Sequence, residues 1–272
     1  MVVRVIMAVT RALAALVGIG WLGLQIWPKS FPPHPDKTRE LGTIELLSDL
    51  PRPVNRHFKA ILEGPIPKIE TAVVWGRVRL KMSGLWIRVR FKAYYLPGQD
   101  FYHYMEFSWF GMPILRGYDS YVDGVGTVEI KGLFKISETG EETNQGQNIT
   151  LWAEAVFAPL VFVTGSQVRW EALDEVSARL VVPFGGQEDS LLVSFDPHTG
   201  LMTQMSAQRY RGQEKVKTPW RVEYRNWRTL HSIKIPMRLT VTWEDESSPR
   251  SFWTIEGVEY NVDVSEQIPG SR

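Results

Sequence analysis

The stretch VVWGRVRLKMSGLWIRVRFKAYY, residues 73–95, decides the fold because it predicts a long antiparallel β-hairpin. Apolar residues alternate with Arg and Lys along both halves, and a Ser-Gly pair at 83–84 separates the halves. A two-residue turn of this kind fixes the register of a hairpin. Met82 then opposes Leu85, and the apolar residues of both strands fall on one face. The hairpin is therefore predicted to have one apolar face and one basic, partly aromatic face.

The basic face raises the question of what offsets its charge. Like charges placed opposite one another destabilise a sheet. If Tyr95 opposes Phe101 across the next turn, Glu106 falls opposite Arg90. We expect either a solvated outer face with this local Arg–Glu network, or a strip that contacts anionic lipid headgroups. The strip consists of Arg77, Arg79, Lys81, Arg88, Arg90 and Lys92.

The apolar face of the same hairpin, extended by the following strand, must be covered. Helices predicted at 54–63 and 144–163 are the candidate covers. Two interpretations stay open: a fully packed core, or an apolar cavity beneath a helical lid that takes an acyl chain or another hydrophobic ligand. The residues predicted to line such a cavity are Val78, Leu80, Ile87, Val89, Phe91, Met105, Phe107, Trp109, Trp152 and Phe157.

Outside the hairpin, the pattern with period two continues from Ile69 almost to the C-terminus. This pattern predicts a mainly β protein with a few helices, in which one large curved antiparallel sheet or incomplete barrel is closed by the helices. The predicted strands are 69–82, 85–95, 101–110, 114–121, 125–136, 167–172, 176–184, 189–196, 201–210, 217–229, 234–244 and 251–262.

The N-terminal region differs from the rest of the chain. Residues Val5 to Trp27 are mostly apolar, with Arg11 as their one charged residue, and the segment is long enough to cross a bilayer. We predict an uncleaved transmembrane anchor at 1–29, a Pro-rich linker at 30–50 that spaces the body from the membrane, and the sheet domain at 51–266. A cleaved signal peptide is the alternative, although no small-x-small cleavage site follows the apolar run.

The charges flanking this segment bear on its orientation. Arg4 and Arg11 favour an N-terminus inside the cell and a body on the extracytoplasmic side of the cell membrane. Lys29, Lys37 and Arg39 on the other flank weaken that preference. The expected localisation is a single-pass cell-membrane protein, with the lipid bilayer as its partner. The formal net charge of +1 makes nucleic acid an unexpected partner.

Motifs for chemistry are weak. The absence of Cys excludes disulfides and thiolate sites, and the five His show no metal-ligand spacing, so neither a cofactor nor a metal is predicted. Glu154 lies in an apolar helix, where a structural pair with Arg116 is expected. Asp119 is attributed to turn chemistry. A hydrolase-like enzyme using Glu154 or Asp119 stays as a third hypothesis.

Several longer runs carry a family resemblance. AYYLPGQDFYHYMEFSWFGMPILRGYDSYVDGVG, LWAEAVFAPLVFV, VRWEALDEVSARLVVPF, FDPHTGLM, PWRVEYRNW and KIPMRLTVTW resemble an uncharacterised bacterial family, classed as a domain of unknown function, with a predicted LolA-like fold. The resemblance covers the chain from about Pro53 to Val264. It implies an incomplete antiparallel barrel closed by helices, the fold of periplasmic lipoprotein carriers.

This chain departs from the soluble carriers because it has an N-terminal apolar segment and lacks a lipobox Cys, so long-range shuttling is not expected. Fold alone does not fix function. The leading hypothesis is a membrane-anchored, non-enzymatic protein that binds a lipid or lipoprotein acyl chain. The second is a β-sheet interaction module of the cell envelope without a cavity.

Overall fold

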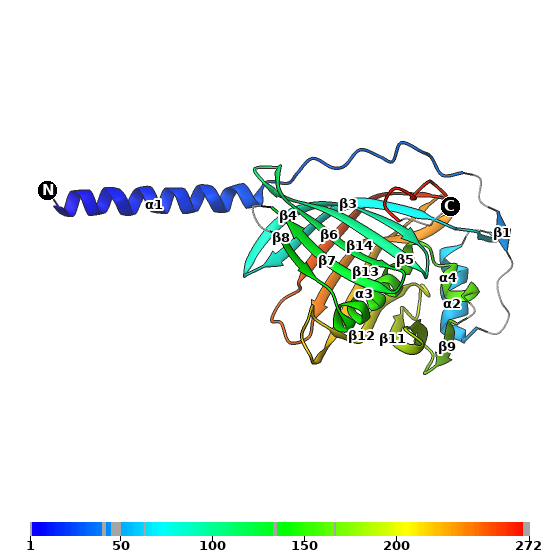
Figure 1. The fold of residues 1–272 in the computed structure, drawn as a ribbon. Coiled ribbons are helices and arrows are strands. Elements are labelled where there is room, and N and C mark those ends of the chain that lie inside the picture. The colour runs from blue at the N-terminus through cyan, green and yellow to red at the C-terminus, as the bar shows by residue number, and fades with distance from the viewer. Residues whose placement is uncertain are drawn as a thin grey trace.

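The computed structural model describes residues 2–39, 42–44, 50–62, 64–132, 135–165 and 167–268. Within these residues, thirteen strands form one curved antiparallel sheet, and short helices cover its concave side (Figure 1). The strands are β3 Ala72–Met82, β4 Leu85–Leu96, β5 Asp100–Trp109, β6 Met112–Val122, β7 Val125–Lys131, β8 Lys135–Glu138, β9 Arg169–Ala172, β10 Ser177–Phe184, β11 Gln187–Phe195, β12 Met202–Tyr210, β13 Lys217–Leu230, β14 Ile233–Trp243 and β15 Ser251–Tyr260.

The order of strands across the sheet is β8-β7-β6-β5-β4-β3-β15-β14-β13-β12-β11-β10-β9. Two meanders, β3 to β8 and β9 to β15, are therefore joined where β15 pairs with β3. The predicted mainly β architecture with one large antiparallel sheet is confirmed. The predicted single strand 125–136 is wrong, because β7 and β8 are separate strands that pair with each other. A separate two-stranded sheet pairs β1 Thr43–Ile44 with β2 Ile66–Pro67.

The register predicted for the 73–95 hairpin is confirmed. Met82 pairs with Leu85 at the turn, and β3 and β4 keep an unbroken register from there. Glu106 also lies opposite Arg90, as predicted from the β4–β5 loop. These pairings follow from local turn geometry and alternation, since a one-residue slip would turn every apolar side chain outward.

The helices that cover the sheet are α2 Arg52–Ile61, α3 Glu141–Glu154, the 3₁₀ turn η1 Ala155–Phe157, and α4 Val161–Thr164. The continuous helix predicted at 144–163 is thus broken after Phe157. Pro159 explains the break, because proline lacks an N–H group and disfavours helical geometry in the residue before it. The shorter helices let the chain turn within the concave side.

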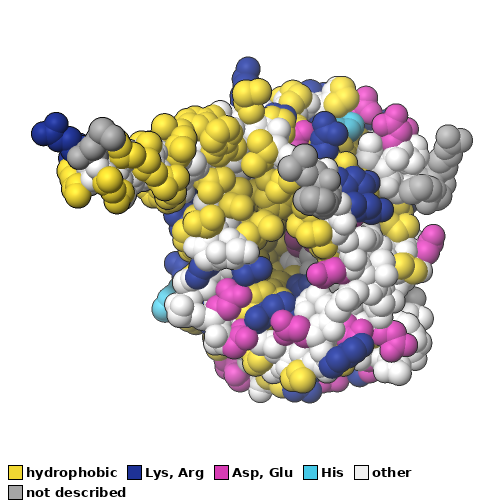
Figure 2. All heavy atoms as spheres, turned by 60° about the vertical axis from the view of Figure 1, so that its left-hand side comes forward, with side chains coloured by type: hydrophobic (Ala, Val, Ile, Leu, Met, Phe, Trp, Pro, Cys, Tyr) yellow, Lys and Arg dark blue, Asp and Glu magenta, His cyan; other side chains and the backbone are white. Residues whose placement is uncertain are grey.

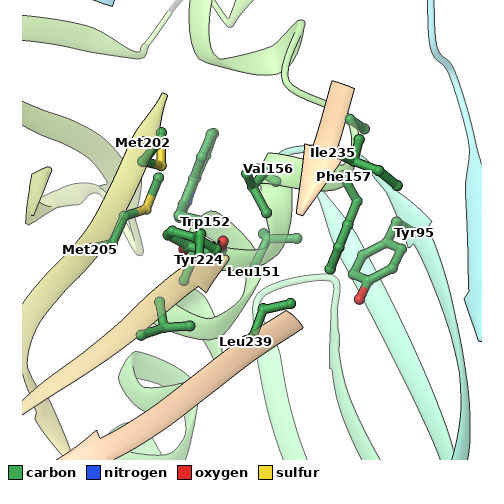
Figure 3. Close-up of a cluster of buried hydrophobic side chains, with 14 of the residues drawn as sticks. Tyr95, Leu151, Trp152, Val156, Phe157, Met202, Met205, Tyr224, Ile235 and Leu239 are labelled. Atoms are coloured by element: carbon green, nitrogen blue, oxygen red, sulfur yellow. Dashed lines mark hydrogen bonds between the residues drawn. The ribbon is translucent and has the colours of Figure 1, made fainter. Parts of the chain in front are cut away.

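Helix α3 contacts β7 on one side and β12 on the other, so it bridges the two arms of the curved sheet. Figure 3 shows side chains from the helical segment packed among strand residues, with Phe157 beside Tyr95. The ring centroids of that pair are 6.3 Å apart. Trp152 is only 2% exposed, which places this segment in the centre of the core.

Helix α1, Val2–Gln25, projects from one end of the sheet (Figure 1). Among the described residues, α1 is the one helix that is both long enough and apolar enough to cross a membrane. Its mean hydropathy is 2.0 over its most apolar window. A signal sequence near an N-terminus has the same features. We call the end of the sheet that α1 joins the α1 end; it includes the β3–β4 turn at 83–84 and the β5–β6 turn at 110–111.

After α1, the chain runs along the outer face of the sheet toward the opposite end (Figure 1). We call residues 26–39 the strap. The carbonyl of Lys29 accepts a hydrogen bond from Arg90 at 3.0 Å, and the Thr38 hydroxyl donates to Glu259 at 2.5 Å. The strap therefore packs back on the sheet and is not a free extended segment, whereas its predicted role as a spacer from the membrane stays a prediction. Parts of the predicted 30–50 linker, 40–41 and 45–49, lie outside the described residues.

Candidate functional site

A cavity of about 240 Å³ lies between the concave face of the sheet and α3. Its walls are mainly apolar and aromatic. They are formed by Leu80, Phe91, Tyr95, His103, Met105, Asp119, Thr150, Ala153, Glu154, Phe157, Arg209, Trp220, Val222, Leu239, Val241, Trp243, Ser251, Trp253 and Ile255. The core is therefore not fully packed beneath the helical cover.

Some of the predicted lining residues reach this cavity: Leu80, Phe91, Met105 and Phe157. Others share its face of the sheet but lie within the packed core around it: Val78, Ile87, Val89 and Phe107. Trp152 is buried beside the cavity and instead lines a separate surface hollow of about 770 Å³. The apolar face was thus identified correctly, whereas the position of the gap within it depends on how α3 and β12–β15 pack.

Trp109 does not line the cavity, which corrects its predicted position. A register shift between Phe107 and Ser108 breaks the alternation in front of it. Its side chain is 41% exposed at the β5–β6 turn, and its indole Nε1 donates to the carbonyl of Gly20 in α1 at 3.0 Å.

A polar cluster interrupts the apolar wall. Strands β4 and β5 bring Tyr95 and His103 side by side, and the end of α3 brings Glu154 to them. His103 Nε2 lies 2.9 Å from Glu154 Oε2, and the Tyr95 hydroxyl donates to the same oxygen at 3.0 Å. Glu154 is therefore held by two partners within the cavity wall.

A second part of the cluster joins β6, α3 and β12. Asp119 lies opposite His103 across the β5–β6 ladder and accepts a hydrogen bond from the Gln147 side chain. Arg209 donates to the Thr150 hydroxyl at 2.9 Å, and its buried Nε has no hydrogen-bond partner within the described part of the chain. Its guanidinium also lies over the Trp220 ring, 4.9 Å from the ring centroid.

Burial changes the proton affinities of these groups. Burial raises the pKa of Asp119 to about 6, even though the nearby His103 and Arg209 act in the opposite direction. Burial lowers the pKa of Arg209 to about 10. For His103, burial acts to lower the pKa, but the charge and hydrogen bond of Glu154 outweigh it, and the pKa is raised. Titratable groups with such shifts in a cavity are typical of functional sites.

Two sequence expectations about this cluster are wrong. Glu154 pairs with His103 and not with Arg116, because Arg116 lies opposite Glu106 on the outer face of the β5–β6 ladder. Asp119 does not serve a turn, because it lies inside β6 and faces the cavity. The ion pair expected for Glu106 is present, with Arg90 Nη2 2.5 Å from its carboxylate.

The sequence interpretation did not select Tyr95, His103 and Arg209 as site residues. A signal existed for two of them, Arg209 and His103. Arg209 has the same parity in β12 as the buried Met205, and His103 has the same parity in β5 as the buried Phe101. A charged or titratable residue on the inward face of a strand is rare unless it is paired. The inward-facing positions of these two residues therefore indicate a polar site within the sheet. The residues that they contact come from distant segments, so the sequence pattern does not identify those partners.

The basic strip is occupied by the strap. The Arg88 guanidinium lies 4.5 Å from the ring centroid of Trp27, and the Arg90 guanidinium lies 4.2 Å from that of Phe31. Lys92 also faces the Phe31 ring, at 5.6 Å. Cation–π contacts of this kind stabilise by about 0.5–1 kcal/mol each at exposed sites.

The other members of the strip also have protein partners. Arg77 pairs with Glu256 at 2.5 Å, Arg79 stacks on Trp86 at 4.5 Å, and Lys81 donates to a serine hydroxyl in the β14–β15 turn at 2.9 Å. The interpretation as a local network therefore accounts for the contacts of these side chains. These partners, together with the aromatic rings of the strap, offset the repulsion between like charges that face one another in the hairpin.

The cavity leads toward the α1 end of the sheet. Asp119, Arg209 and Trp243 also line an open hollow of about 700 Å³, which is bordered by the β12–β13 turn and by Arg250. We call this hollow the mouth. Figure 2, in which α1 projects at the left, shows a hollow with a largely hydrophobic wall and charged side chains along its lower rim. Within the described residues, no group of three or more His, Asp or Glu could hold a metal ion.

Comparisons with known proteins give one family and several distant structures. None of the curated proteins matches the chain. Solved structures similar to it include a DUF1329 family protein from Desulfovibrio piger (11% identity, 73% of this chain and 89% of that one, TM-score 0.45), a putative outer membrane lipoprotein-sorting protein domain from Vibrio parahaemolyticus (9%, 79% and 91%, 0.41), and a LolA superfamily protein from Nitrosomonas europaea (8%, 79% and 94%, 0.44).

Identities and scores this low transfer neither a ligand nor an activity. The family match is more direct, because a family model covers residues 40–255, which include the hairpin, the polar cluster and most of the sheet. The chain therefore belongs to DUF6544, a family of unknown function.

Proposed function

We propose that this protein is a membrane-anchored, non-enzymatic binding protein that holds the apolar chain of a lipid or lipoprotein in the cavity beneath α3. The observation that carries the proposal is a mainly apolar cavity with a polar cluster in one wall and an opening at one end. Binding sites for small hydrophobic molecules combine such walls with a few polar groups that fix orientation.

The size of the cavity indicates which part of a ligand it takes. Its volume of about 240 Å³ corresponds to roughly eight groups the size of water or methylene, at about 30 Å³ each. This is smaller than the range of about 300–1,000 Å³ that is usual for sites enclosing a whole drug-sized ligand. The cavity therefore suits part of one chain, and the remainder of the ligand would extend through the mouth.

The polar cluster indicates the chemistry of the ligand near the mouth. Asp119 and Glu154 oppose Arg209 and His103 in charge, so the cluster as a whole is close to neutral. It supplies a free donor, the unpaired Arg209 Nε, together with carboxylate acceptors. Such a set favours an uncharged polar group, such as an ester or hydroxyl, over a bare anion, which two carboxylates would repel.

Membrane attachment is the second part of the proposal. Helix α1 would cross the membrane once, with the body on the extracytoplasmic side, as Arg4 and Arg11 favour. Because the strap packs directly on the sheet, the body would lie next to the membrane surface. The chain contains no Cys, so single introduced cysteines labelled with a membrane-impermeant reagent on intact cells test this sidedness.

The binding proposal is tested by mass spectrometry of lipids that co-purify with the detergent-solubilised protein. Ala153→Leu adds volume inside the cavity, and Ala172→Leu makes the same change at an exposed position on β9. We expect lipid to co-purify with the wild type and Ala172→Leu at similar stoichiometry, and to be depleted at least fivefold in Ala153→Leu. Equal lipid content in all three proteins would contradict the proposal.

A second candidate function is acid–base catalysis on the bound ligand. One observation favours it: Asp119, with a pKa of about 6, faces His103 across the β5–β6 ladder inside an accessible cavity. Glu154 is a weaker candidate base, because it already accepts hydrogen bonds from two partners. Turnover of short-chain acyl esters by the wild type, lost in Asp119→Asn without loss of ligand binding, would replace the non-enzymatic proposal.

A further inference from the structure

An apolar patch lies at the α1 end of the sheet, on two hairpin tips next to the end of α1. We call it the tip patch; it consists of Leu85, Trp109, Phe110, Met112 and Ile114. Their exposed fractions are 50%, 41%, 42%, 70% and 51%. Large apolar side chains grouped at one site with this exposure mark an interaction surface.

The tip patch is joined to α1 by specific contacts. The backbone N–H of Phe110 donates to the carbonyl of Gly23 at 2.8 Å, and the Trp109 indole donates to that of Gly20 at 3.0 Å. The absence of a side chain at Gly23 makes this approach possible, since a Cβ there would collide with the Trp109 ring. The patch is therefore held at the level of the last two turns of α1.

That level coincides with the apolar part of α1. The run free of charged residues extends from Ala12 to Trp27, so it continues beyond Gly23. At about 1.5 Å per residue this run is roughly 24 Å long, which is shorter than a hydrocarbon core of about 30 Å. A span placed over this run would bring the tip patch to the edge of the hydrocarbon region, where Trp is favoured.

The exposed side chains of α1 make the two surfaces continuous. Trp21, Leu22 and Ile26 are 54%, 53% and 44% exposed beside the tips. The same end of the sheet carries the mouth, which is bordered by the β12–β13 turn and Arg250. An apolar surface that continues a candidate membrane span has the lipid bilayer as its natural occupant.

We propose that the β3–β4 and β5–β6 hairpin tips insert into the bilayer beside α1, so that the mouth faces the membrane surface. A ligand chain then exchanges between the bilayer and the cavity without crossing bulk water. This inference rests on the proposed anchoring by α1, but it does not depend on the identity of the ligand. Retention of the chain in carbonate-washed membranes tests the anchor separately.

The insertion is tested on the full chain in nanodiscs, using the Cys-free background. Met112→Cys and, as a matched control, Leu173→Cys each receive one environment-sensitive fluorophore. Leu173 is also an exposed apolar residue, at 46%, but it precedes β10 at the opposite end of the sheet. Lipids brominated near the headgroup then report contact with the hydrocarbon edge.

We expect the probe at Met112 to be quenched at least threefold more strongly than the probe at Leu173. Ile114→Cys provides a second position in the patch and should behave like Met112→Cys. Equal, weak quenching at all three positions would overturn the proposal. Weak quenching combined with energy transfer between labelled copies would also overturn it, in favour of a second copy of the chain as the occupant. Loss of the chain from carbonate-washed membranes would contradict the anchor instead.

Discussion

A ligand series of increasing chain length tests the cavity most directly. We predict that affinity for straight-chain alkanols rises with each added methylene and then levels off when the cavity is full. An alkanol suits the comparison because its hydroxyl can both donate to and accept from the polar cluster. The cavity therefore sets both the slope and the breakpoint of the series.

The expected magnitudes follow from the structure. Each methylene buried in the cavity contributes about 0.8 kcal/mol, or about a fourfold gain in affinity. A volume of about 240 Å³ holds roughly eight such groups at about 30 Å³ each, so the gain should end near eight carbons. Ala153→Leu adds three carbons to the wall and should move the breakpoint to about five, whereas Ala172→Leu should leave it unchanged.

The assay uses the aromatic wall. Trp220, Trp243 and Trp253 line the cavity, so alkanols with a terminal bromine quench their fluorescence on binding. Titrations of the full chain in nanodiscs, referenced to empty nanodiscs for partitioning into lipid, give the affinity for each length. A steady rise in affinity through twelve carbons would refute the reasoning, and so would a breakpoint that is the same in the wild type and Ala153→Leu. In either case the alkyl chain of the ligand would lie outside the cavity.

Three further predictions concern the groups around the cavity and the outer face. The pKa of Asp119 is raised in the folded protein, which means that the fold favours the protonated carboxyl group. The free energy of unfolding should therefore fall by up to about 3 kcal/mol as the pH rises from about 4 through 6. Urea unfolding across this pH range should show a smaller fall for Asp119→Asn than for the wild type. Glu106→Gln leaves Arg90 without its carboxylate partner and should cost about 2 kcal/mol in the same assay at pH 7; an unchanged unfolding midpoint would mean that strap contacts alone hold the guanidinium. Gly23→Leu should displace Trp109 from α1 and more than double the rate at which protease cleaves the β5–β6 turn, and Gly18→Leu, at a helix position with open space around it, serves as the control.

The local structure of the sheet was predictable because its determinants are local. The period-two alternation of residues 73–95 and the two-residue turn at 83–84 fix which side chains share a face, whatever the rest of the chain does. The same reasoning placed Glu106 opposite Arg90. The break after Phe157 was also signalled, by Pro159, but the apolar run around it concealed the end of the helix.

The contents of the site were less predictable because they join distant segments. Tyr95 and Glu154 meet across 59 residues, and the contact between Thr38 and Glu259 spans 221. No periodic pattern specifies such pairs, so Glu154 was given the wrong partner. The strap likewise turned a strip predicted to face solvent or headgroups into a packed outer layer.

The sequence by itself determined a two-faced antiparallel sheet, an apolar concave side in need of a cover, and an N-terminal helix suited to a membrane. Only the tertiary structure decided that the cover leaves a gap of about 240 Å³, that buried titratable groups line it, and that it adjoins an open hollow bordered by the β12–β13 turn. The physical reason is that alternation sets the direction of each side chain, whereas a cavity is the volume left unfilled when α3 and the two arms of the sheet pack together.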